Sequence, residues 1–222
     1  MSTCLTERSI NYKKAEKELF HQKIWVAGID EVGRGALAGP VYAGASILDF
    51  NKLDALKKNE RSLIRDSKTL SHAQRQKAVC LIETIALDHS VAHASSLEIE
   101  TLGIVGATFL AMHRALEKLS HAFHVLFIDG KFPLPEFHGE QKAIIGGDNA
   151  TYSIAAASIL AKEARDAFMR EQSSLYPHYH FHANVGYGTR QHLDAISEQG
   201  ACPLHRKNFS PFTGAQNSLF GD

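Results

Sequence analysis

Four carboxylates of this chain follow apolar segments, where they could bind a divalent cation. Asp30 and Glu31 close the apolar run 24–29, and Asp129 closes the run 125–128. Charged groups at the end of a buried strand are costly without a compensating partner, and a divalent metal is a common partner for carboxylates. Oxygen-only ligands favour Mg²⁺ or Mn²⁺ over zinc. Two such ions about 3.5–4 Å apart can activate a water and stabilise the leaving oxygen of a phosphodiester.

The fourth carboxylate, Asp148, follows two isoleucines and two glycines and precedes an alanine-rich segment. Taken alone, this position fits a turn- or helix-capping residue at least as well as a metal ligand. The catalytic interpretation is stronger for Asp30 and Glu31, because a glycine-rich loop with one arginine follows them directly. The predicted catalytic residues and metal ligands are Asp30, Glu31, Asp129 and Asp148.

The loop after the carboxylate pair, Gly33-Arg34-Gly35 followed by Gly39, also admits a dinucleotide-binding interpretation. That motif opens directly into a helix, whereas Pro40 here introduces another strand-like segment. In the absence of a metal, two carboxylates at the mouth of the loop would also repel a pyrophosphate. A loop that lets its backbone approach a phosphodiester, with Arg34 as a phosphate ligand, is the better interpretation.

The composition is typical of one α/β domain, with 222 residues of which 44% are hydrophobic. Lys+Arg and Asp+Glu both number 24, and this zero net charge is not the overall charge of a typical nucleic-acid-binding protein. Residues 51–77 nevertheless carry eight basic side chains against three acidic ones. This local excess fits either a phosphate-facing surface or a solvated helix face.

The cysteine pattern indicates a reducing compartment, because Cys4, Cys80 and Cys202 are scattered and odd in number. The first residues lack the apolar core of a signal peptide, and no apolar run approaches the length of a membrane span. We therefore expect a cytoplasmic protein with no membrane partner. Zero net charge does not exclude a dimer, but we expect a monomer.

Hydrophobic periodicity predicts strands followed by alternating helices and strands. The short link between the first two strands suggests an antiparallel pair, and the later elements suggest a mixed sheet flanked by helices. The predicted helices are 11–21, 71–87, 98–119, 150–173 and one between Thr189 and Gly200, and the predicted strands are 24–30, 41–48, 91–95, 124–130 and 142–145.

Several motifs occur in a specific order along most of the chain. They lie at 28–35 with 39–41, 66–70, 128–130, 147–148, 154–162 with 165–166, 176–177, 186–189 with His192, and 205–206. On this ordered set, the chain from about Val26 to Phe212 resembles the bacterial ribonuclease HII family (type 2 ribonuclease H). In having an arginine in Gly33-Arg34-Gly35, the chain resembles the type 2 enzymes and differs from the related type 3 enzymes.

The resemblance implies an α/β fold, namely a ribonuclease H-like mixed five-stranded sheet flanked by helices, with a small C-terminal helical extension. It implies a catalytic domain over residues 23–212 that includes this extension. An N-terminal extension, 1–22, whose sequence predicts a helix, would precede the domain, and a flexible tail, 213–222, would follow it.

The resemblance also implies a reaction. An enzyme of this family would use Mg²⁺ or Mn²⁺ to cleave the RNA strand of RNA–DNA hybrids and to incise duplex DNA 5′ of embedded ribonucleotides, leaving 3′-hydroxyl and 5′-phosphate ends. A catalytically silent hybrid-binding module on the same fold is the alternative. It is disfavoured because a pure binder gains nothing from carboxylates that face phosphates. A third interpretation, another metal-dependent phosphoesterase, would cleave independently of a 2′-hydroxyl.

The same resemblance assigns substrate contacts. Gly33, Arg34 and Gly35 would contact the 2′-hydroxyl and neighbouring phosphates, which requires the close approach that glycine permits. Tyr187 would stack beneath the sugar at the RNA–DNA junction; without the family match, a packed surface aromatic is the simpler interpretation.

Four more residues are substrate-binding candidates. Ser158 and Lys162 lie on a polar stripe of the alanine-rich helix, with Arg165 beside it and Lys68 at the end of the basic segment. Such a stripe is more often a solvated face. Here we expect it to border the substrate groove and support the site.

A histidine run lies outside the resemblance. His178, His180 and His182 alternate, so they would share one face of an extended segment. Zinc binding is a minor alternative there to solvated loop histidines.

The C-terminal tail contains Gln216, Leu219 and Phe220, and it resembles the short peptides that dock on bacterial sliding clamps. A polar tail that presents two apolar anchors suits such binding. A sliding clamp is therefore a candidate partner.

Overall fold

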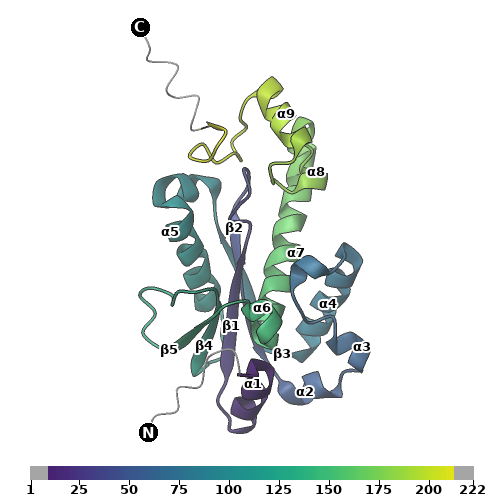
Figure 1. Cartoon of the computed structure of the whole chain (residues 1–222), viewed down its shortest axis with the longest axis vertical. Coiled ribbons are helices and arrows are strands. Elements are labelled where there is room, and N and C mark those ends of the chain that lie inside the picture. Colours follow the sequence, from purple (N-terminus) through teal and green to yellow (C-terminus); the bar gives the residue numbers. More distant parts are fainter. Residues whose placement is uncertain (1–9, 213–222) are drawn as a thin grey trace. The chain divides into compact units, whose positions relative to one another are not determined.

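The computed structural model describes residues 10–212 (Figure 1). Contacts between Cα atoms divide the chain into two compact units, each built from three stretches. The first unit contains the described residues up to Asp30, together with 45–90 and 119–159. The second contains 31–44, 91–118 and the described residues from Leu160 onward.

Helices and strands alternate along much of the chain. The helices are α1 (Tyr12–His21), α2 (Phe50–Ala55), α3 (Lys58–Arg61), α4 (His72–Ile85), α5 (Ser96–Glu117), α6 (Gly147–Ala150), α7 (Tyr152–Leu175), α8 (Phe181–Asn184) and α9 (Arg190–Gln199), with 3₁₀ turns η2 (Ser67–Thr69) and η3 (Pro177–Tyr179). The strands are β1 (Val26–Val32), β2 (Val41–Leu48), β3 (Ala86–Ala94), β4 (Val125–Asp129) and β5 (Glu140–Ile144).

The five strands form one sheet in the order β3-β2-β1-β4-β5, as Figure 1 shows. β1 is parallel to β4, and β4 is parallel to β5. β1 is buried at six of its seven positions, as expected for a parallel strand covered on both faces. The predicted mixed five-stranded sheet flanked by helices is therefore confirmed, and β2 lies beside β1 as the short connection suggested.

The core of the first unit forms where α1 and α7 pack on β1 and β4. Val26, Phe127 and Ile154 are buried together, and Tyr12 and Leu19 of α1 pack against them. The ring of Tyr12 meets that of Phe127 edge to face at 6.2 Å between centroids. The predicted N-terminal helix is confirmed, and in this structure it completes a core.

A buried glutamate joins α1 to the start of α7. Glu16 is fully buried, and its carboxylate accepts hydrogen bonds from the amides of Tyr152 and Ser153 and from the Ser153 hydroxyl. It thus satisfies amides of the first turn of α7, which have no partners within the helix. Burial raises the pKa of Glu16 to about 7, although these bonds and Lys13 oppose the shift.

Stability is therefore expected to depend on the protonation of Glu16. Because its pKa is higher in the folded chain than the ordinary 4.5, the folded state holds this proton more tightly. The contribution is complete below about pH 4.5 and is lost as the pH rises through 7, by up to roughly 3 kcal/mol. Urea unfolding between pH 4.5 and 8 should show this loss in the wild type and not in Glu16→Gln. Glu18→Gln, an exposed change on the same helix, should retain it.

The main boundary that differs from prediction lies between α4 and β3. The predicted helix continued to 87 and the predicted strand began at 91, whereas β3 begins directly after Ile85. Two long-range contacts explain this: the Asp49 amide donates to the Ile85 carbonyl at 2.9 Å, and the Asp88 carboxylate accepts from the amides of Ser120 and His121. Local periodicity does not report such contacts.

The second unit has its own core around the C-terminal helices. Phe181, Met169 and Ile196 are buried in one cluster that also contains Ala38 and Cys202. The rings of Tyr179 and Phe181 stack at 5.6 Å. The small C-terminal helical part that the resemblance implied thus consists here of α8 and α9, packed on the second half of α7.

Candidate active site

The register of β1 and β4 brings two of the predicted catalytic carboxylates together. Ile29 pairs with Ile128, so Asp30 and Asp129 are the next residues on two adjacent parallel strands. Neighbouring strands lie about 4.8 Å apart, and paired positions point to the same face of the sheet. Asp30 is only 4% exposed, so its carboxylate is almost completely removed from water.

Asp148 lies in the first turn of the short helix α6, in the same unit as Asp30 and Asp129. The Gly147 amide donates to Asp129 Oδ1 at 2.7 Å, which ties the end of β4 to the start of α6. A Cβ at 147 would come within 2.5 Å of Ile154 Cδ1 and 3.3 Å of Asp129 Oδ1, so glycine leaves room for this contact. Burial, followed by the negative charges of Asp129 and Asp66, raises the pKa of Asp148.

Lys68 lies near the carboxylates of this unit and is attracted to them. Asp66 caps the 3₁₀ turn η2 by accepting from the Lys68 amide at 2.9 Å, which fixes the backbone of the lysine. Partial burial lowers the pKa of Lys68, but attraction to the nearby carboxylates outweighs it, and the net shift is upward. The carboxylates responsible, which we call the acidic cluster, are Asp30, Asp66, Asp129 and Asp148.

The donor chemistry of the acidic cluster fits a hard divalent cation. The cluster presents carboxylate oxygens, which Mg²⁺ and Mn²⁺ prefer, and its mutual repulsion is a cost that a bound cation would relieve. Within residues 10–212, no group of three or more His, Cys, Asp or Glu side chains is arranged to hold a metal ion. The predicted metal-ligand roles therefore stay predictions.

Ser158 is buried in the first unit, next to the turn that carries Lys68. Its hydroxyl lies 3.0 Å from that of Ser67, and both residues are almost fully buried. The bond links α7 to the turn that carries Lys68. Ser158, predicted to contact substrate, thus makes a contact that supports the position of Lys68.

The fourth predicted ligand, Glu31, belongs to the second unit, as does the glycine-rich loop. Arg34 Nη1 lies 3.0 Å from Glu31 Oε1, and the arginine side chain is half exposed. Arg34 can therefore exchange this partner for a phosphate at little cost, because exposed ion pairs contribute little stability. The exposed Gly35 leaves the backbone beside it open to a ligand.

Two buried arginines hold the backbone of that loop. Arg206 donates to the carbonyls of Gly33, Arg34 and Gly39 at 2.8–2.9 Å. Burial and then repulsion from Arg165 lower the pKa of Arg206 to about 9, so it remains charged at neutral pH.

Arg165 donates to the carbonyls of Pro40, Ala38 and Val185 at 2.9–3.1 Å. Any side chain at Gly33, whose φ is +93°, would collide with the guanidinium of Arg165. Arg165, predicted to bind substrate, is fully buried, and its contacts hold the loop.

Tyr187 and Lys162 lie together in the second unit. The half-buried ring of Tyr187 has Arg165 5.3 Å and Lys162 5.9 Å from its centroid, at cation–π distances. Lys162 also bonds Asp166 at 2.7 Å. Two cations thus contact the ring of Tyr187. On the polar stripe of α7, Lys162 forms an ion pair with the buried carboxylate of Asp166.

Several residues of these sites had no role in the sequence prediction. The sequence assigns Asp66 only to the motif 66–70, and Arg206 with its neighbour His205 only to the motif 205–206. From sequence alone, a basic residue in a polar, irregular segment is expected to be exposed to solvent. The carbonyls that Arg206 binds belong to residues more than 160 positions away, which no local signal reveals.

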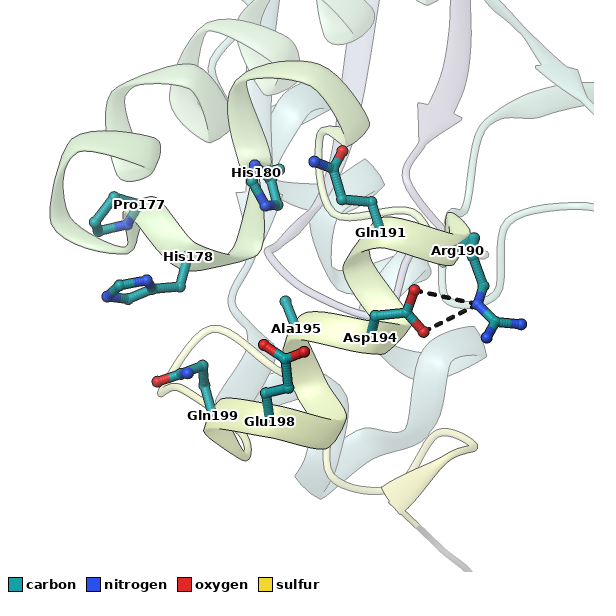
Figure 2. Close-up of a pocket in the computed structure, with 9 residues that line it drawn as sticks. All are labelled: Pro177, His178, His180, Arg190, Gln191, Asp194, Ala195, Glu198 and Gln199. Carbon is teal, nitrogen blue, oxygen red and sulfur yellow. Dashed lines mark hydrogen bonds and ion pairs between the residues drawn. The ribbon is translucent and has the colours of Figure 1, made fainter.

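The histidine run lines a pocket of the second unit instead of forming an extended segment. His178 and His180 border a pocket of about 580 Å³ opposite α9, where Arg190 pairs with Asp194 at 2.9 Å (Figure 2). The run folds into η3 and α8, so the expected alternation on one face is wrong. His182 Nδ1 lies 3.3 Å from the Ser173 hydroxyl oxygen. No zinc site is found among the residues that the structure describes.

No helix within residues 10–212, the part of the chain that the structure describes, is both long enough and apolar enough to cross a membrane.

Comparison with known proteins places most of the described chain in one family. The family model for ribonuclease HII matches residues 27–211. The ribonuclease HII of Synechococcus sp. (strain CC9902) is 46% identical over 184 residues, covering 83% of this chain and 91% of the relative. The crystal structure of ribonuclease H2 from Pyrococcus horikoshii OT3 superposes with a TM-score of 0.71 at 21% identity, covering 90% of this chain and all of that one.

A second solved structure, Bst ribonuclease HIII in complex with Mn²⁺, has a TM-score of 0.65 at 19% identity and covers 89% of this chain and 70% of that chain. At such identities the two structures establish the fold, and the sequence matches establish the family. The chain belongs to the ribonuclease HII family and is a ribonuclease H enzyme.

Proposed function

We propose that this enzyme cleaves the RNA strand of RNA–DNA hybrids and also incises duplex DNA on the 5′ side of an embedded ribonucleotide, leaving 3′-hydroxyl and 5′-phosphate ends. The observation that carries the proposal is the register of β1 and β4, which aligns Asp30 with Asp129 inside the acidic cluster. The free cysteines Cys80 and Cys202 support a cytoplasmic location, and we infer a monomer.

The chain supplies positioned charges for this reaction. Mg²⁺ or Mn²⁺ bound by the four predicted ligands (Asp30, Glu31, Asp129 and Asp148) would activate a water and stabilise the leaving oxygen. The Gly147 amide fixes the orientation of the Asp129 carboxylate. Lys68, exposed and positively charged beside the acidic cluster, would bind a substrate phosphate and offset the repulsion between that phosphate and the carboxylates.

Recognition of RNA would come from the second unit. The 2′-hydroxyl alone distinguishes a ribonucleotide from its neighbours in DNA. Gly33, Arg34 and Gly35 would read it through backbone groups, and Arg34 would bind an adjacent phosphate. The loop is suited to this role because Arg206 fixes its carbonyls, so little conformational entropy is lost on binding.

The decisive experiment is cleavage of a labelled DNA duplex that carries one ribonucleotide, beside an all-DNA control, with Mg²⁺, Mn²⁺ or EDTA. We expect incision 5′ of the ribonucleotide only, and only with metal. Cutting of both duplexes would indicate a general phosphoesterase. No incision by folded protein with either metal would indicate a hybrid-binding module.

Tyr187→Ala should lower the rate of cleavage at a single ribonucleotide more than it weakens binding of a long hybrid. Loss of an aromatic stacking surface costs about 1–3 kcal/mol, or about 5- to 150-fold. Single-turnover cleavage and hybrid affinity should be measured on the same preparations. Tyr187→Phe keeps the ring and should stay near the wild type. Equal losses of rate and affinity in Tyr187→Ala would argue against a stacking role.

We further propose that the tail binds a sliding clamp through Gln216, Leu219 and Phe220, all of which lie outside the described residues. A fluorescent peptide of residues 213–222 should bind the cognate clamp saturably in an anisotropy titration. Two apolar anchors carry most of the energy of such a peptide, so the Phe220→Ala peptide should bind at least about tenfold more weakly. Equal binding of the two peptides, or no saturation, would exclude this interaction.

A further inference from the structure

Two buried histidines of the second unit lie end to end between the C-terminal segment and Tyr187. His192 and His205 are 0% and 1% exposed, and their Nε2 atoms are 3.1 Å apart. His192 Nδ1 lies 2.9 Å from the Tyr187 carbonyl oxygen, and His205 Nδ1 lies 2.9 Å from the Cys202 amide. Neither histidine has a role in the reaction proposed above.

The partners at the two ends determine where the protons are. A carbonyl oxygen only accepts, so His192 must carry its proton on Nδ1. The Cys202 amide only donates, so His205 Nδ1 must be bare and its proton must be on Nε2. That Nε2–H then points at the bare Nε2 of His192, which accepts it. A single arrangement satisfies all three bonds, and in it every donor points toward Tyr187.

The arrangement requires both rings to be neutral. A second proton on His205 would set an N–H against the Cys202 amide, and one on His192 would set two N–H groups against each other. Burial is the main cause that lowers the pKa of both rings, to about 4 for His205, so both are neutral at pH 7. Aromatic contacts with Tyr179 and Phe181 hold the rings in place.

We propose that His192 and His205 are positioning residues for Tyr187, which they hold by its backbone carbonyl through a directed chain of hydrogen bonds that begins at the Cys202 amide. The inference rests on the proposed role of Tyr187 in substrate recognition. The Tyr187 carbonyl also accepts from the Thr189 amide at 2.8 Å, and the Tyr187 amide donates to the Asn184 carbonyl at 2.9 Å. Both sides of the Tyr187 backbone are therefore fixed, and the histidine chain links that point to the C-terminal segment.

The proposed positions of the protons on His192 and His205 can be tested without measuring enzyme activity. Long-range ¹H–¹⁵N correlation spectra of the ¹⁵N-histidine-labelled full chain at pH 7 report the tautomer of each ring. We expect the Nδ1–H form for His192 and the Nε2–H form for His205. The same tautomer in both rings, or a rapidly averaged pair, would overturn the proposal.

Two matched variants test the effect on Tyr187. In His192→Asn, the side-chain amide occupies the place of Nδ1 and can still donate to the Tyr187 carbonyl. In His192→Gln, the amide occupies the place of Nε2 and the bond is lost. We expect His192→Asn to stay within a few-fold of the wild type on a single-ribonucleotide duplex, and His192→Gln to lose about tenfold in kcat/KM, the usual effect of one lost hydrogen bond.

The Tyr187→Ala background separates positioning from general damage. If His192 acts through the tyrosine ring, His192→Gln should cause no further loss in that background. The same tenfold loss in both backgrounds would overturn the proposal. If Tyr187→Ala alone costs nothing, the proposed role of Tyr187 fails, while the tautomers still decide whether the chain of bonds exists.

Thermal melts establish that each variant is folded. Should His192→Gln fail to fold, His205→Asn replaces it, because it keeps an acceptor for the Cys202 amide and loses the donor to His192. It should show the same loss, again absent in the Tyr187→Ala background; wild-type activity of folded His205→Asn would overturn the proposal.

Discussion

Asp30→Asn is expected to reduce cleavage of a single-ribonucleotide duplex by at least about a thousandfold, because stabilisation of transition-state charge by a bound metal is worth several kcal/mol. Asparagine has nearly the same shape as aspartate but carries no charge, so it would bind a divalent cation far more weakly. Since Asp30 is buried beside other carboxylates, removing its charge also relieves repulsion, and the fold should be no less stable.

The measurement is single-turnover cleavage at saturating Mg²⁺, with thermal unfolding of the same preparations. Asp54→Asn is the matched control, because Asp54 is a surface carboxylate of the same unit that pairs with Lys17 and Arg61. It should cleave at close to the wild-type rate. Near-normal cleavage by Asp30→Asn would contradict the assignment of this carboxylate to the reaction.

Arg206→Met is expected to cause the largest loss of stability among the changes considered. It removes three hydrogen bonds from the guanidinium to the carbonyls of Gly33, Arg34 and Gly39. A hydrogen bond to a charged group contributes about 1.5–3 kcal/mol, so we expect the free energy of unfolding to fall by roughly 3–5 kcal/mol. This is a large part of the 5–15 kcal/mol that is typical of a domain.

Urea denaturation would measure the change in the free energy of unfolding. Arg190→Met, which removes an exposed arginine that pairs with Asp194, should cost less than about 1 kcal/mol. Arg206→Lys keeps the charge but cannot reach three carbonyls with one ammonium, so its loss should lie between these values. A loss below 1 kcal/mol for Arg206→Met would mean that the loop holds its conformation without the arginine.

Much of the fold could be predicted from the sequence, because long apolar and amphipathic segments report their own burial. The helix at Tyr12–His21, the strand at Val41–Leu48 and the long helix at Tyr152–Leu175 all have a clear period. The short helices Phe50–Ala55 and Gly147–Ala150 were missed, since they are too short to show one. The early start of β3 depends on contacts with Asp49, Ser120 and His121, which are distant along the chain.

The candidate site divides in the same way. The ordered motifs of the sequence by themselves determined the family. The sequence also singled out the carboxylates as candidates, because a charged residue that ends an apolar strand is anomalous wherever it occurs. Only the tertiary structure decided that Asp30 and Asp129 share a register and that Lys68 faces four carboxylates. It also decided that Arg165 and Arg206 are buried supports of a loop and that His192 and His205 form one chain of bonds. The physical reason is that a polar side chain has no fixed environment in sequence: whether it is solvated, paired or buried depends on donors and acceptors that folding brings from distant positions.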